Sequence, residues 1–172
     1  IIQVSQTVTL SAQKLDDLHV AIEIISAVAL NKSDILKDYL QALQTLKTVD
    51  RAGFVQFASN TAFLLAQLIV QKRSKEAETL LQHGDSLFGA ETFTEALRTP
   101  PVLDLLAQNL DPQDIRQHAL VWKIFDGRLK VPFAQWPNVR KLLSNTFAAL
   151  GNSGEASSAP PDDVRGILTA IL

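Results

Sequence analysis

The chain has 172 residues, a formal net charge of −2 and 47% hydrophobic residues, which suits a single domain with one hydrophobic core and excludes collagen-like, low-complexity and strongly disordered classes. It contains no cysteine, which excludes disulfides, thiolate chemistry and cysteine-ligated metal sites. The near-neutral net charge provides no overall attraction to nucleic acid or to an anionic membrane.

Helical signals begin after the first ten residues and continue through the first half of the chain. Ser11 is expected to cap a first helix, Ser33 to start a second, and Asp50 to open a third that reaches about Arg73. Apolar residues surround the second half of the third helix, which predicts a central, buried position. Residues 1–10 alternate weakly between apolar and polar, and this pattern is typical of either an extended arm or a further helical turn.

Glycine and proline divide the second half into shorter helices. A fourth helix is expected to run from Ser74 or Lys75 to Gly84, where glycine acts as the C-terminal stop. Four more segments are predicted: one around Phe93, one starting at Pro101, one opened by Asp111-Pro112, and one over about 138–150 that ends at Gly151.

These elements predict an all-α fold of about eight or nine antiparallel helices, arranged as a helical bundle or as a short, solenoid-like stack of helical hairpins. Residues 1–150 form the predicted helical core domain. Residues 151–161 are small and polar, typical of a flexible linker, and 162–172 form a terminal amphipathic helix that docks on the core or on a partner. The long apolar runs are interrupted by polar residues, so no membrane span is expected.

Some clusters of residues resemble catalytic or metal sites but lack the geometry or the ligands that such sites need. His83, Asp85 and Ser86 are nearly adjacent, whereas a hydrolase triad needs the imidazole between nucleophile and carboxylate. The pairs His19/Glu23 and Asp114/His118 are four residues apart, but each lacks a third metal ligand nearby. Phosphate-binding glycine loops are missing. We therefore expect no catalytic residues, no metal and no cofactor.

One short region combines basic and aromatic residues. Residues 113–141 hold six Lys/Arg against two Asp/Glu. Basic side chains with exposed aromatic rings bind single-stranded nucleic acid, and Trp and Arg also anchor protein interfaces. A third interpretation is that the aromatic residues pack a loop onto the core and leave the lysines in solvent. The candidate partner-binding residues are Trp122, Lys123, Arg128, Lys130, Trp136, Arg140 and Lys141.

The terminal helix supplies two further candidates, Ile167 and Ile171, on its apolar side. This helix is too short to be stable alone, so it docks on the core, on a neighbouring copy to give a homo-oligomer, or on another protein. We therefore expect a non-enzymatic protein–protein interaction module, a fragment of a larger scaffold or adaptor. The alternative is a nucleic-acid-binding domain that uses residues 116–141. The sequence does not assign the compartment; cytoplasm or nucleus is favoured.

Overall fold

The computed structural model of the chain describes residues 11–125, 136–153 and Arg165. Within these residues the chain forms eight α-helices and no strand, which confirms the predicted all-α fold. The helices are α1 (Ala12–Ala29), α2 (Ser33–Val49), α3 (Arg51–Val70), α4 (Ser74–Phe88), α5 (Ala90–Leu97), α6 (Pro100–Asn109), α7 (Ile115–Phe125) and α8 (Trp136–Ser153).

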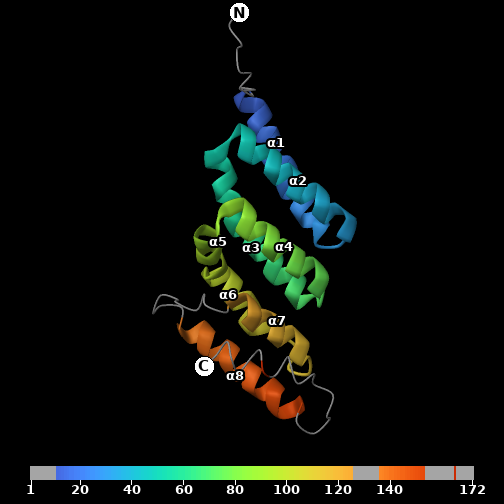
Figure 1. Ribbon diagram of the computed structural model, residues 1–172, viewed down its shortest axis with the longest axis vertical. Helices are drawn as coiled ribbons and strands as arrows, with labels where there is room; N and C mark the ends of the chain where they lie inside the picture. Colours follow the sequence, from blue (N-terminus) through green and yellow to red (C-terminus); the bar gives the residue numbers. More distant parts are fainter. Residues whose placement is uncertain (1–10, 126–135, 154–164, 166–172) are drawn as a thin grey trace, which may run out of the picture.

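The helices stack along the long axis of an elongated molecule (Figure 1). The helices of each pair, α1 with α2 and α3 with α4, pack against one another, and α8 packs on α6 and α7. Each helix thus makes its main contacts with helices close to it in sequence, as in a stack of helical hairpins. As a result, α1 and α8 lie at opposite ends of the stack.

Two of the predicted helix starts are confirmed by their capping bonds. The Ser11 side chain accepts a hydrogen bond from the Lys14 amide at 3.4 Å, and Asp50 Oδ1 accepts one from the Gly53 amide at 3.0 Å. Each bond satisfies one of the amide groups that have no partner inside the first helical turn. Local sequence therefore sets the starts of α1 and α3.

The third helix is central, as its apolar composition predicts. It contacts the helices on both sides of it along the chain, from α1 to α7. Among the described residues, α3 is the helix whose length and hydropathy would allow it to cross a membrane, yet 61% of that stretch is buried inside the protein. Burial of this kind is what a core helix requires, so the stretch is weak evidence for a span.

The predicted stop at Gly84 is wrong. Helix α4 continues to Phe88 and ends at Gly89, which has a φ of 86°. Gly84 lies inside the helix against the ring of Phe93, where a side chain would overlap that ring. Glycine at position 84 therefore allows the close approach of α5 and does not end α4.

Two other predicted boundaries also shift. Helix α7 begins at Ile115, because Asp111 first forms a turn in which its Oδ1 accepts from the Gln113 amide at 2.9 Å. Asp114 Oδ1 then accepts from the Gln117 amide at 3.3 Å, so Asp114 provides the cap. Helix α8 runs to Ser153, so the first three residues of the predicted linker 151–161 are helical. The rest of that linker lies outside the described residues.

Candidate interaction surfaces

An apolar face of α1 is exposed to solvent. Val20, Ile24 and Val28 are 54%, 59% and 38% exposed, and their spacing of four residues places them on one side of the helix. The opposite side buries Ile22 and Ala29 against the rest of the fold. Helix α1 is therefore apolar on two sides, of which only one is covered.

Smaller and polar residues surround these three side chains. Exposed Ala21 and Ala27 flank Ile24, and together the five residues Val20, Ala21, Ile24, Ala27 and Val28 are named the α1 outer face. Asp16 and Asp17 are exposed before this face, and Asn31 and Lys32 are exposed after it. Asp17 accepts a hydrogen bond from the Gln13 side chain at 3.1 Å. The face is thus an apolar patch with an acidic end and a basic end.

This concentration of apolar surface is peculiar to α1 among the described residues. Of the five large hydrophobic side chains that are exposed among these residues, three lie on α1, and the other two are Val55 on α3 and Phe147 on α8. The end helix of a helical stack normally has a polar outer side, because no further helix covers it. The α1 outer face departs from that rule and is therefore a candidate interaction surface.

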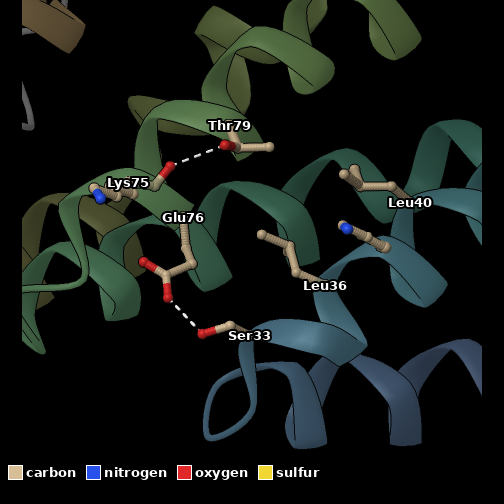
Figure 2. Close-up of a pocket in the computed structure, with 7 residues that line it drawn as sticks. Ser33, Leu36, Leu40, Lys75, Glu76 and Thr79 are labelled. Atoms are coloured by element: carbon tan, nitrogen blue, oxygen red, sulfur yellow. Dashed lines mark hydrogen bonds between the residues drawn. The ribbon is translucent and has the colours of Figure 1, made fainter.

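A groove of about 240 Å³ lies between α2 and α4 (Figure 2). Its walls are formed by Ser33, Leu36, Lys37, Leu40, Lys75, Glu76 and Thr79. Ser33 and Glu76 point toward one another, and the Ser33 hydroxyl donates to Glu76 Oε1 at 2.6 Å. That hydrogen bond, more than the neighbouring Arg73, holds the pKa of Glu76 below its ordinary value. The one carboxylate of the groove is therefore engaged in structure.

Arg73 completes this polar cluster from the start of α4. Its guanidinium donates to Glu76 Oε1 at 3.3 Å and to Ser33 Oγ at 3.1 Å. It also donates to the carbonyl groups of Ala29, at 3.2 Å, and Leu30, which end α1. These bonds satisfy free carbonyls of α1 and tie the first helix pair to the second.

The structure separates the residues of the predicted basic and aromatic region. Trp122 is fully buried, and its Nε1 donates to Thr146 Oγ1 at 2.8 Å, so its ring is packed in the core and is not presented to a partner. Lys123 is exposed and forms an ion pair with Glu78 at 3.3 Å. Arg140 and Lys141 are exposed on α8. The prediction that Trp122 belongs to a binding surface is therefore corrected.

The other five predicted partner-binding residues lie wholly or partly outside the described part of the chain. Trp136 is the first residue of α8, whose predicted start was about residue 138, and the side chain of Trp136 lies outside what the structure describes. Arg128, Lys130, Ile167 and Ile171 also lie outside the described residues.

Helix α8 carries an aromatic residue that the sequence analysis missed. Phe147 is 52% exposed and stands seven residues after Arg140, hence on the same side of α8. We name Arg140, Lys141 and Phe147 the α8 outer face. Helix α8 lies at one end of the stack, and Phe147 is on the side of it that faces away from the buried residues Leu142, Thr146 and Ala149.

The histidines are engaged in structural contacts. His118 is fully buried; its Nε2 lies 3.0 Å from the Asp111 carbonyl oxygen and its Nδ1 lies 3.0 Å from Thr146 Oγ1. Because a carbonyl oxygen only accepts, Nε2 carries a proton, and in the neutral ring Nδ1 is an acceptor. The one proton of the Thr146 hydroxyl is then shared between Nδ1 and the Leu142 carbonyl oxygen, which lies 2.9 Å from Thr146 Oγ1. Burial lowers the pKa of His118, which favours this neutral form.

The other two histidines also contact nearby groups in the fold. His19 Nε2 lies 3.2 Å from Asp50 Oδ2 rather than forming a ligand pair with Glu23, and His83 Nδ1 lies 2.8 Å from the Thr79 carbonyl of its own helix. Among the residues that the structure describes, no group of three His, Asp or Glu side chains is placed to hold a metal ion.

Comparison of the chain with protein-family models, with curated proteins and with solved structures finds no match. The surfaces described above are therefore the basis for assigning a function.

Proposed function

We propose that the chain is a non-enzymatic protein–protein interaction module and that the α1 outer face is its docking surface. The observation that carries this proposal is the exposure of Val20, Ile24 and Val28 on one side of an end helix. Covering each of these half-exposed side chains would contribute on the order of 1 kcal/mol to binding. A stack of helices that presents such a face is suited to a place within a larger scaffold or adaptor.

The charges near this face favour a protein over a lipid surface. Helices that lie in a membrane interface usually carry lysine and arginine on their polar side. Helix α1 carries Asp16, Asp17 and Glu23 but a single basic residue, Lys14. An acidic helix of this kind is repelled by anionic lipid headgroups, whereas a protein partner can complement it.

The polar groups of the described residues support a role without catalysis. His118 has both ring nitrogens engaged, and Glu76 accepts from Ser33 and Arg73. A general base or nucleophile has to reach a substrate with a free atom. The contacts of His118 and Glu76 instead connect one helix to another, α7 to α8 and α4 to α2.

Affinity capture tests this proposal. The full chain is immobilised and exposed to nuclease-treated lysate of its source, alongside the variants Ile24→Glu and Val55→Glu. Val55 is 48% exposed but stands alone on α3, so Val55→Glu is the matched control. We expect specific protein partners that survive nuclease, disappear with Ile24→Glu and remain with Val55→Glu. Identical capture by both variants would contradict the proposal, once circular dichroism shows that both are folded.

The second candidate function is nucleic-acid binding through the α8 outer face. The observation that favours it is the exposure of Phe147 on the same helix as Arg140 and Lys141, because aromatic rings stack on bases while basic groups neutralise phosphates. Binding of single-stranded oligonucleotides should then weaken steeply with salt. It should be lost in Arg140→Glu/Lys141→Glu and kept in Lys37→Glu/Lys75→Glu, which has the same net charge. Equal loss in both variants, or binding insensitive to salt, would count against it.

A further inference from the structure

We infer that the partner of the α1 outer face is a second copy of this chain, with the two α1 helices antiparallel and related by a twofold axis at Ile24. This inference rests on the proposed function and names the partner of the same surface. It is independent of the predicted terminal helix 162–172.

The first argument is the symmetry of the face about Ile24. Val20 and Val28 stand four residues before and after it, and Ala21 and Ala27 stand three residues before and after it; all five are exposed. A twofold axis at Ile24 brings each residue against the one equally distant on the other side. Val20 then faces the partner's Val28, and Ala21 faces the partner's Ala27. The two Ile24 side chains meet at the centre. Such a self-complementary patch is what a symmetric dimer requires.

The second argument is charge. The acidic end of the face has Asp16 and Asp17, and the basic end has Lys32, with Asn31 beside it. Asp16 lies on α1 eight residues before Ile24, and Lys32 lies in the turn that follows α1, so the antiparallel arrangement brings the Asp16 end of one copy to the Lys32 end of the other. A parallel arrangement places carboxylates against carboxylates and ammonium against ammonium. Charge complementarity therefore favours the antiparallel pair over the parallel one.

The third argument concerns size and strength. Val20 to Val28 cover about 12 Å along the helix, and packed helices lie roughly 8–10 Å apart. A contact made by one helix from each copy is at the small end of specific interfaces. We therefore expect a reversible dimer with a dissociation constant on the order of micromolar or weaker.

The absence of native cysteine makes a direct test possible, since any introduced thiol is the only one in the chain. Single variants Val20→Cys, Ile24→Cys, Val28→Cys and the control Val55→Cys are oxidised under mild conditions at concentrations where the dimer forms. Facing Cα atoms of closely packed helices come within disulfide range. We expect Ile24→Cys to form a disulfide-linked dimer with itself. Val20→Cys and Val28→Cys should crosslink mainly when these two variants are mixed.

Sedimentation velocity over a range of concentrations provides a second measurement that needs no cysteine. The wild-type chain should show a concentration-dependent dimer, and Ile24→Glu should weaken it by at least tenfold. Asp16→Lys and Lys32→Glu should each weaken it several-fold, and the double variant, which exchanges the two charges, should recover most of the loss.

The outcomes separate this inference from the proposed function. Crosslinking of Val20→Cys and of Val28→Cys each with itself, without mixing, would mean parallel pairing and would overturn the inference. A wild-type chain that stays monomeric at all concentrations would overturn it as well. If Ile24→Glu at the same time loses a different captured protein, the docking surface stands and only the identity of its partner is wrong.

Discussion

Thr146 on α8 accepts a hydrogen bond from Trp122 Nε1 on α7 at 2.8 Å, and His118 Nδ1 lies 3.0 Å from the same hydroxyl oxygen. All three residues are fully buried. One hydroxyl thus satisfies two polar rings in an otherwise apolar contact between the last two helices. The indole N–H of the buried Trp122 is thereby satisfied, while its neighbour Lys123 on the next side of α7 is exposed.

Thr146→Val should remove this shared hydroxyl while keeping the shape of the side chain. The Trp122 N–H and His118 Nδ1 then lose their partner in the core, which should lower the free energy of unfolding by about 1–3 kcal/mol. Urea denaturation followed by tryptophan fluorescence measures the change. The control is Thr45→Val on the surface, where the hydroxyl donates to the Gln41 carbonyl at 3.1 Å, and it should change stability by less than about 0.5 kcal/mol. Equal effects of the two variants would refute the importance of the buried hydroxyl.

His118 should make the stability of the fold depend on pH. Burial lowers its pKa in the folded chain below the ordinary 6.5, so below that pH the unfolded chain binds more protons than the folded one. The stabilising contribution of neutral His118 is complete above about pH 6.5 and is lost as the pH falls through the folded-state pKa.

Denaturation of the wild type and of His118→Gln between about pH 7.5 and 5 measures this contribution. The wild type should lose more stability on acidification than the variant. The control His83→Gln, which replaces an exposed imidazole, should behave like the wild type. If the free energy of unfolding of His118→Gln falls with pH as steeply as that of the wild type, another group causes the pH dependence.

Gly84→Ala should destabilise the chain even though alanine favours helices. The added methyl group overlaps the Phe93 ring, and such overpacking costs about 1–3 kcal/mol, more than the gain in helix propensity of about 1 kcal/mol. Gly151→Ala is the matched control, because Gly151 is also helical but its Cβ would meet nothing within 4 Å. In thermal unfolding, the melting temperature of Gly84→Ala should lie below that of the wild type and the melting temperature of Gly151→Ala above it. If both substitutions raise the melting temperature, Phe93 moves aside freely.

Arg73→Met should loosen α1 and α2 from the rest of the stack. The substitution removes hydrogen bonds to the end of α1, to Ser33 and to Glu76, and a hydrogen bond to a charged group contributes about 1.5–3 kcal/mol. Hydrogen exchange should become faster in α1 and α2 than in α6 to α8. The exposed Arg51 gives the control Arg51→Met, and uniform acceleration in all helices would argue against a local role for Arg73.

The features that the sequence predicts well are those set by neighbouring residues. Ser11 and Asp50 lie next to the amide groups they cap, so their roles follow from spacing alone. Gly84 was misinterpreted because its partner Phe93 comes from the next helix, and a glycine needed for close packing looks the same in sequence as one that ends a helix. The end of α4 therefore required the structure.

The candidate surfaces were harder to predict for a related reason. Trp122 has basic neighbours on the surface and a buried hydrogen-bond partner, Thr146, that is distant in sequence. The apolar residues from Val20 to Val28 lie on two sides of α1, and their sequence does not distinguish the side that packs on the fold from the side that is exposed at the end of the stack. Exposure of Phe147 on α8 has the same origin. Sequence supplies the helices, whereas the order of their stacking decides which faces remain uncovered.

Photo-crosslinking from the α1 outer face tests the central claim most directly. A benzophenone amino acid replaces Ile24 in the full chain, with Val55 as the control position, and the protein is irradiated in cells of its source. We predict discrete, nuclease-resistant protein adducts from position 24 that are missing from position 55. No adduct from position 24, or the same adducts from both positions, would contradict the claim that this face is a docking surface.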